Sequence, residues 1–356
     1  MTAPSLYDFA RGDAPFTYPP LAALLLRPLA EVPVPLLQTL WTLVTVAAVT
    51  VMAFLAVRAY VGHSGDAAPD DEPCGPRLTP NRLTSGLAGW VALALALSAP
   101  FSSNVRFGQV SVFLAVLVLI DLLVLRRTRW GGVLTGLAAA VKLTPLIFVA
   151  LLFLAGRRRA AVTAAATFAV GTALGAVARP ADSRRFWTSQ IFDVGRLGHI
   201  TSAGNQSLNG MLLRLHLPAE PRFLLALALG GAIAAAALRR AARAARAGDW
   251  LTAAIIAGAA SIVLSPVSWT HHQFWLVLGI LLPVRGHRAR VAWIVLVIIC
   301  MILPVTALGG PLWTNARLLL AIGISAVLCI RPVELPTLQR RPSAGTDRLG
   351  TTGGRR

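Results

Sequence analysis

Long apolar runs separated by short polar stretches form the pattern of this chain. An α-helix rises 1.5 Å per residue, so about 20 apolar residues cross the hydrocarbon core of a bilayer. The pattern therefore predicts an all-α polytopic membrane protein with about eight full spans. We expect these spans among nine apolar runs, at residues 34–57, 83–99, 110–125, 160–178, 223–238, 250–264, 274–284, 291–308 and 316–330. Residues 1–33 contain no such run, and the short apolar piece at 21–30 predicts an interfacial or re-entrant segment.

The apolar run at 131–155 has an unusual centre and unusual flanks. Its centre carries Lys142 and Pro145, and clusters of arginine stand on both sides, at 126–129 and 157–159. Both clusters favour the cytoplasmic side of a membrane, which a single crossing cannot provide. A re-entrant or broken-helix hairpin satisfies both flanks, with Lys142 near its tip and a helix break at Pro145.

Composition agrees with a membrane protein and narrows the function classes. The 356 residues are 56% hydrophobic and only 13% charged, and the mean hydropathy is +0.69. The net charge of +19 comes from arginines that lie in short clusters between apolar runs, which indicates membrane orientation rather than nucleic-acid binding. Cys74, Cys300 and Cys329 have no spacing typical of a disulfide framework or a metal site. The first 15 residues are polar and are not expected to act as a cleavable signal peptide.

The arginine clusters also predict a topology. If every short arginine-rich loop is cytoplasmic, the outer loops are 1–33, 100–109, 179–222, 265–273 and 309–315. Lys142 then points to the same outer face. We expect residues 1–330 to form one transmembrane domain that is incomplete at its N-terminus, because a polar N-terminus on the outer side requires a further span before Met1. Residues 331–356 are expected to be a disordered basic cytoplasmic tail.

Lys142 and the pair His271 and His272 are the main candidates for chemistry. Lys142 is the one lysine of the chain, and an ionisable group inside an apolar segment suggests a functional site, here a cation for a phosphate. The alternative is a lysine that snorkels to the interface. Adjacent helical residues point about 100° apart, so only one histidine should face the site. No acid lies near them, which favours acid–base or phosphate-binding chemistry over a metal, and interfacial or helix-capping roles are the alternatives.

Several other polar or aromatic side chains fall in the predicted outer loops. Their simpler explanations are Asx turns, interfacial aromatics and anchoring cations. As candidates for substrate or phosphate binding, they are Tyr18, Arg106, Gln109, Asn205, Gln206, Asn209, Trp187 and Trp269. The outer acids, Asp8, Asp13, Asp182 and Asp193, are more typical of solvated surface positions.

These stretches, in this order, resemble family 87 glycosyltransferases, the polyprenyl-phosphate-dependent mannosyltransferases of the GT-C superfamily. The resemblance extends from about residue 5 to about residue 330. It rests on Phe16-Thr17-Tyr18-Pro19-Pro20, Arg106-Phe107-Gly108-Gln109, Ala140-Val141-Lys142-Leu143-Thr144-Pro145, Gly204-Asn205-Gln206-Ser207-Leu208-Asn209-Gly210 and Ser265-Pro266-Val267-Ser268-Trp269-Thr270-His271-His272.

The resemblance implies a GT-C fold in the plasma membrane and an active site on its outer face. Such enzymes transfer a sugar, usually mannose and in some members arabinofuranose, from a polyprenyl phosphate to a glycolipid or glycan of the cell envelope. They invert the anomeric carbon. The lipid phosphate leaves as an anion, so neither a metal nor another cofactor is required, and Lys142, Arg106 and one histidine would supply positive charge.

The chain departs from the family pattern in one respect. The carboxylate taken as the base lies early in the first outer loop of family members, and this chain begins after that point. We therefore expect either a shortened chain or an inactive copy, and do not assign Asp8 as the base. A transporter or flippase of lipid-linked sugars is the alternative function, since broken helices suit it too. A non-catalytic membrane scaffold is a second alternative.

Overall fold

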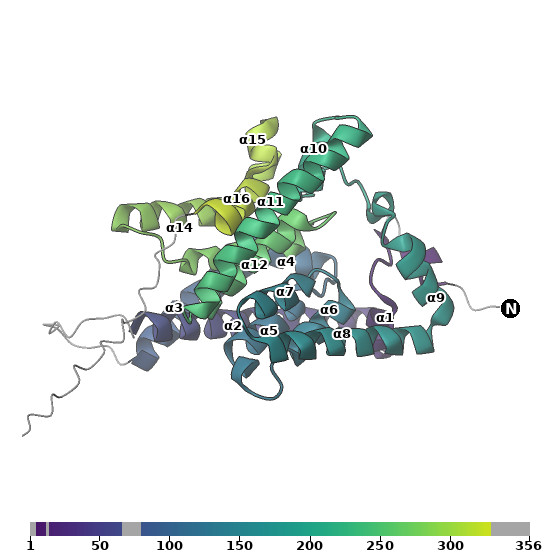
Figure 1. Ribbon diagram of the computed structural model, residues 1–356, viewed down its shortest axis with the longest axis horizontal. Coiled ribbons are helices and arrows are strands. Elements are labelled where there is room, and N and C mark those ends of the chain that lie inside the picture. Colours follow the sequence, from purple (N-terminus) through teal and green to yellow (C-terminus); the bar gives the residue numbers. More distant parts are fainter. Residues whose placement is uncertain (1–4, 12–13, 66–79, 329–356) are drawn as a thin grey trace, which may run out of the picture.

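The computed structural model describes residues 5–11, 14–65 and 80–328, and these residues are mostly helical (Figure 1). The α-helices are α1 (Pro20–Leu26), α2 (Val34–Gly65), α3 (Pro80–Ala96), α4 (Ala99–Arg106), α5 (Ser111–Leu123), α6 (Val133–Val141), α7 (Leu146–Leu154), α8 (Arg158–Ala178), α9 (Pro180–Arg185), α10 (Leu208–Arg214), α11 (Ala219–Arg246), α12 (Trp250–Leu264), α13 (Phe274–Val277), α14 (His287–Ile302), α15 (Gly310–Thr314) and α16 (Ala316–Ile322). The expected tail at 331–356 lies outside the described residues.

Short helical segments and one small hairpin connect these helices. The 3-10 segments are η1 (Leu6–Asp8), η2 (Arg27–Glu31), η3 (Leu125–Arg127), η5 (Val194–Leu197), η6 (Thr270–His272), η7 (Leu278–Leu281) and η8 (Val305–Ala307). The π segments are η4 (Phe186–Gln190) and η9 (Gly323–Val327). Strands β1 (Ala10–Arg11) and β2 (Ala14–Pro15) pair antiparallel over two residues each. The predicted all-α class is confirmed.

The long helices carry the membrane character. In the described part of the chain, α2, α8 and α11 are each long and apolar enough to cross a bilayer, and α3 with α4 makes a fourth candidate bent by 58°. Large apolar side chains remain exposed on these helices, among them Phe54 on α2, Leu174 on α8 and Leu227 on α11. So much exposed apolar surface on long helices is typical of contact with lipid, as expected for a polytopic membrane protein.

Two of the expected segments need correction. The expected outer loop at 100–109 is largely helix α4. Pro100 does not prevent this helix, because it stands in the first turn, where a backbone N–H would make no hydrogen bond within the helix. The expected crossing at 274–284 contains only α13 and η7, four residues each. Leu282 is extended before Pro283, which ends the helix far short of a membrane thickness.

The break predicted at 131–155 is confirmed. Helices α6 and α7 have nine residues each, and the chain leaves the helical conformation at Lys142 (φ −153°, ψ 134°). Helices α6 and α8 run parallel and in close contact. A Cβ on Gly132 would lie 2.0 Å from the Ala160 carbonyl oxygen, and a Cβ on Gly171 would lie 2.7 Å from the Ala140 Cβ.

Because α6 and α8 begin side by side, α7 must return toward the start of α6. Residues 131–155 therefore form a re-entrant hairpin with Lys142 at its tip. Helix α1 packs on α8 beside the hairpin, since Leu21 lies against both Gly171 and Gly175 of α8.

A buried carboxylate fixes the start of the hairpin. Asp121 on α5 is 1% exposed, and its two oxygens accept hydrogen bonds from the backbone N–H groups of Gly132 and Thr135, each at 2.7 Å. These N–H groups belong to the first turn of α6 and would otherwise lack partners inside the helix. Asp121 thus ties α5 to the hairpin and complements the positive end of α6.

We expect Asp121→Ala to destabilise the protein by about 2–4 kcal/mol, because two hydrogen bonds to a charged acceptor are lost and two buried donors are left unpaired. Thermal unfolding in detergent measures this as a lower Tm. Asp249→Ala is the matched control, since Asp249 accepts a single backbone bond from Thr252 and should cost less. Equal losses in the two variants would contradict the role given to Asp121.

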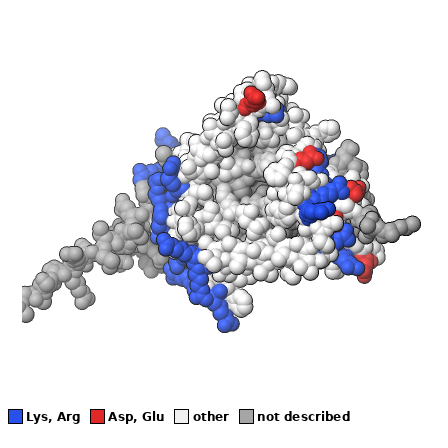
Figure 2. All heavy atoms as spheres, turned by 45° about the vertical axis from the view of Figure 1, so that its right-hand side comes forward, with Lys and Arg blue, Asp and Glu red and all other residues white. Residues whose placement is uncertain are grey.

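The polar loops separate to two ends of the molecule. At one end, Arg126 and Arg157 both lie within 6 Å of the Trp250 ring, and Arg246 donates to the Leu154 carbonyl. Figure 2 shows a band of basic side chains along one edge, charges of both signs at the opposite edge, and an uncharged hollowed face between them. The contacts agree with the predicted grouping of the short arginine-rich loops.

The other end joins all five of the predicted outer loops. Residues 5–18 contact 179–196, Tyr18 contacts Gln109, Ser103 contacts His271, and residues 205 and 206 contact 268 and 314. The candidate residues of the sequence therefore gather around this end, above the hairpin tip.

Candidate functional site

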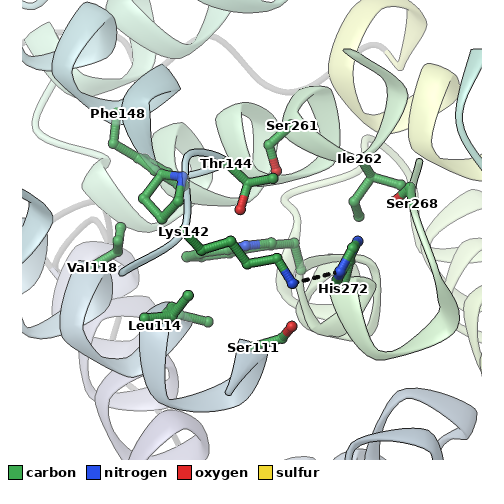
Figure 3. A pocket seen from close by; sticks show the side chains of 13 residues that line it. Ser111, Leu114, Val118, Lys142, Thr144, Phe148, Ser261, Ile262, Ser268 and His272 are labelled. Carbon is green, nitrogen blue, oxygen red and sulfur yellow. Dashed lines mark hydrogen bonds between the residues drawn. The ribbon is translucent and has the colours of Figure 1, made fainter. Parts of the chain in front are cut away.

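Lys142 and His272 form the centre of the site. Lys142 Nζ lies 2.8 Å from His272 Nε2, and both side chains are half-buried (Figure 3). At this distance an ammonium donates a hydrogen bond to the ring nitrogen, so the ring proton belongs on Nδ1. His272 Nδ1 is buried and has no hydrogen-bond partner among the described residues. With Lys142 protonated, the pair carries one positive charge and leaves a buried donor free for a ligand or water.

Tyr18 covers Lys142 from the side of α1. Lys142 Nζ lies 5.1 Å from the centre of the Tyr18 ring, a cation–π distance. The Tyr18 hydroxyl donates to Gln109 Oε1 at 2.6 Å. Gln109 follows Gly108, whose φ of +57° permits the turn between α4 and α5. Tyr18, Gln109 and Lys142, all predicted site residues, thus come together from segments about 90 and 30 residues apart in the sequence.

A cavity of about 30 Å³ lies beside the pair, which is room for one or two waters. Its walls mix polar side chains with apolar ones from α5, α7, α12 and α13, including Leu114, Phe148 and Trp275. The hydroxyls of Ser111 and Ser268 also line it, and both are buried without a hydrogen-bond partner among the described residues. Unpaired polar atoms that line a cavity are typical of a place that holds water or a polar ligand. Ser111 could not be recognised from the sequence, because its only local feature is its place at the start of an apolar run.

His271 points away from this pair. Its ring stands at 89° to that of His272, and its Nδ1 lies 3.4 Å from Ser103 Oγ on α4. It is 6% exposed and does not line the cavity. Of the two histidines only His272 reaches Lys142, in agreement with the expectation that one of them faces the site.

The loop at 204–210 holds the segment that leads to the histidines, residues 266–268, in place. Asn205 Oδ1 accepts hydrogen bonds from Ser207 N, Ser207 Oγ and Ser268 N, at 2.9 to 3.2 Å. Gln206 is bonded at both ends of its amide, to the Thr314 carbonyl and to Leu318 N. Both side chains are at most 1% exposed, so their polar groups serve the protein's own loops. The binding role predicted for them stays a prediction, and the contacts assign them a supporting role.

The remaining candidates do not line the cavity beside Lys142. Asn209 donates to the Pro266 carbonyl, and Trp269 lies against Gly198 and Gly204. Arg106 is exposed at the end of α4, with its guanidinium 5.4 Å from the centre of the Phe107 ring. Trp187 packs edge-on against Phe186 and Phe168 rather than facing the cavity.

No carboxylate of the described residues forms an ion pair with Lys142. The acids Asp8 and Asp182 are held by arginines elsewhere, and Asp121 caps α6. The described residues also contain no group of three or more His, Cys, Asp or Glu side chains suited to a metal ion. The charge at the hairpin tip is therefore a cation without an anionic partner in this part of the chain, and such a site favours a phosphate.

Comparison with known proteins identifies a matching family. The glycosyltransferase family 87 profile matches residues 16–266, a range that includes Tyr18, Lys142 and the loop at 204–210. No solved structure matches the chain.

Curated relatives from mycobacteria are also similar. A Mycobacterium tuberculosis polyprenol-phosphate-mannose-dependent alpha-(1-2)-phosphatidylinositol mannoside mannosyltransferase is 36% identical over 78% of this chain and 64% of its own length. The Mycolicibacterium smegmatis protein of the same name is 33% identical over 79% of this chain and 64% of its own length. A pentamannoside mannosyltransferase of Mycolicibacterium smegmatis is 33% identical over 77% of this chain and 63% of its own length. The chain therefore spans less than two thirds of these relatives. Since the family profile covers most of it, the chain belongs to glycosyltransferase family 87.

Proposed function

We propose that this protein transfers mannose from a polyprenyl phosphate to a glycolipid of the cell envelope, with inversion at the anomeric carbon. The observation that supports this most is the unpaired Lys142 cation, 2.8 Å from His272 at the tip of a re-entrant hairpin. A phosphate that gains charge as it departs is the ligand that such a half-buried cation stabilises best. The names of the relatives support polyprenol phosphate mannose as the donor.

In the proposed reaction, the acceptor hydroxyl oxygen bonds to the anomeric carbon while the bond from that carbon to the phosphate oxygen breaks. The electron pair of the broken bond leaves with the polyprenyl phosphate. Lys142 stabilises the departing phosphate, and Tyr18 and His272 hold the ammonium in place. The acceptor proton passes to a base, and the apolar wall around Phe148 and Trp275 keeps bulk water away.

We further propose that the site opens to the outer face of the plasma membrane. The arginine-rich loops gather at the end of the molecule opposite the site, and clusters of this kind favour the cytoplasm. A phosphatidylinositol mannoside is the proposed acceptor, by analogy with the names of the relatives.

Purified protein in detergent tests this function. Incubation with a short polyprenyl phosphate mannose and a mannosylated phosphatidylinositol should give a product heavier by one hexose, detected by mass spectrometry. Detergent removes the two compartments that a transporter needs, so product formation excludes the flippase alternative. Donor binding without any product would contradict the proposed function.

A further inference from the structure

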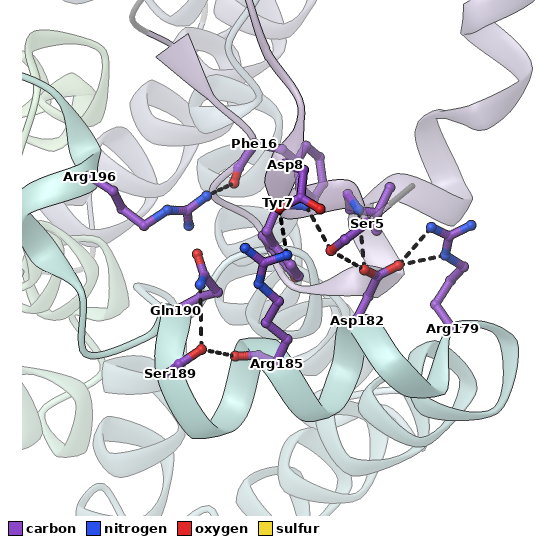
Figure 4. Close-up of polar contacts among 11 residues, drawn as sticks. Ser5, Tyr7, Asp8, Phe16, Arg179, Asp182, Arg185, Ser189, Gln190 and Arg196 are labelled. Carbon is purple, nitrogen blue, oxygen red and sulfur yellow. Dashed lines mark hydrogen bonds and ion pairs between the residues drawn. The ribbon is translucent and has the colours of Figure 1, made fainter. Parts of the chain in front are cut away.

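The first residues of the chain are tied to the loop that follows α8. Residues 5–11 and 14–18, called here the strap, lie against α9 and the segment after it (Figure 4). Asp182 on α9 is the main attachment. Its Oδ1 accepts from Ser5 Oγ at 2.6 Å and from Leu6 N at 3.2 Å, and its Oδ2 pairs with Arg179 at 2.7 Å.

Asp182 is well placed to hold the strap. It is only 4% exposed, so its hydrogen bonds are shielded from water. Burial raises the pKa of Asp182, but the hydrogen bonds from Ser5, Arg179 and Leu6 outweigh it and keep the pKa below its usual range. The carboxylate is therefore charged at neutral pH, where these contacts have their full strength.

Aromatic contacts continue from this attachment toward the site. Tyr7 is 6% exposed and stacks on Phe186 at 5.9 Å between ring centres. Its hydroxyl donates to the backbone carbonyl of Tyr18 at 3.0 Å. Arg196 adds a second link, because it donates to the Phe16 carbonyl at 2.8 Å and lies over the Tyr7 ring.

The contacts form an unbroken path from Asp182 through Tyr7 and Tyr18 to Lys142. Tyr18 meets Lys142 only if its backbone is held over the hairpin tip, and Tyr7 and Arg196 both bond to backbone carbonyls within two residues of it. We propose that Asp182 is a positioning residue for sugar transfer, which acts through the strap to hold Tyr18 against Lys142. This inference rests on the proposed function of the Lys142 site and adds a distant residue that controls it.

The docking of the strap can be measured without any activity. Trypsin has one susceptible bond before Arg58, after Arg11 in the strap, because Arg27 precedes a proline. We expect Asp182→Ala to release the peptide 1–11 at least about tenfold faster than wild type, by mass spectrometry, as loss of the buried contacts raises the population of the undocked strap. Asp8→Ala is the matched control, since Asp8 lies on the strap but pairs with Arg185 in an exposed contact worth little.

Kinetics then test whether docking matters for the reaction. We expect Asp182→Ala to lower kcat and kcat/KM together by about 10- to 100-fold, with a KM for the donor close to wild type, because misplacing Lys142 weakens the transition state more than binding. In a Tyr18→Leu background, Asp182→Ala should lower kcat by less than about a further threefold, since its effect passes through Tyr18. Asp182→Asn keeps the oxygen that accepts from Ser5 and Leu6, and should recover part of the activity.

The outcomes separate this proposal from the proposed function. Faster release of the peptide with unchanged kinetics overturns the positioning role, and so does an unchanged release rate. If the fold loss in kcat of the double variant equals the product of the losses in the two single variants, the path through Tyr18 is overturned. If the wild-type protein transfers no sugar, the proposed function fails, while the release rate still reports whether Asp182 holds the strap.

Discussion

Lys142→Met should reduce kcat for mannosyl transfer by about three orders of magnitude. Methionine keeps the length of the side chain and suits the apolar surroundings, but it removes the charge that faces the departing phosphate. Loss of a single preorganised donor typically lowers kcat by about 10²- to 10³-fold, and a charged donor in a water-poor site belongs at the upper end. Transfer of labelled mannose to the lipid acceptor, measured at saturating donor, checks this expectation.

Two controls make the Lys142 result specific. The variant should elute as wild type in size exclusion and unfold at a similar or higher temperature, because an unpaired charge at the hairpin tip costs stability. Lys142→Arg keeps the charge but not the compact ammonium, and should be intermediate in rate. A Lys142→Met protein with more than about a third of the wild-type kcat would remove Lys142 from the mechanism.

His272→Ala should lower kcat by about 10²-fold, while His272→Gln should keep about a tenth of the wild-type rate. The reason is the 2.8 Å contact between Lys142 Nζ and His272 Nε2, in which the histidine accepts a hydrogen bond and orients the ammonium. A glutamine oxygen can accept the same bond, and alanine cannot. Steady-state kinetics of both variants, with the pH profile of kcat, measure the difference.

His271 provides the comparison for this pair of variants. It contacts Ser103 on α4 and does not reach Lys142, so His271→Gln should have a smaller effect on kcat than His272→Ala. If His272→Gln is as inactive as His272→Ala, and the acidic limb of the pH profile disappears in both, then His272 moves a proton instead of orienting Lys142.

The hairpin could be predicted from the sequence because of the arginine clusters on both sides of it. Both clusters favour the cytoplasmic side of the membrane, which one crossing cannot satisfy, and Lys142 and Pro145 between them indicate a tip at Lys142. The grouping of polar loops on one face predicted that Lys142 and one histidine lie on the same side, and the structure adds that His272 contacts Lys142 directly. The broken segment at 274–284 was missed because an apolar run of that length suits both a short span and a buried helical piece.

Other features depend on contacts that no local pattern reveals. Asp121 sits in an apolar run, and only the approach of α6 explains why a carboxylate belongs there. Asn205 and Gln206 belong to a stretch typical of turns, and their bonds to residues 268, 314 and 318 join segments about 60 to 110 residues apart. The attachment of the strap to Asp182 spans an even longer separation in the sequence. From the sequence, Asp182 could therefore only be grouped with the other acids as a surface residue.

Binding of polyprenyl phosphate to the purified protein tests the central claim most directly, because it asks whether Lys142 receives the donor phosphate. Isothermal titration in detergent, with a short polyprenyl phosphate that carries no sugar, gives the affinity of wild type and of Lys142→Met. We predict that wild type binds and that the variant binds at least about tenfold more weakly, a difference of about 1.4 kcal/mol. Equal affinities for the two proteins would contradict the account.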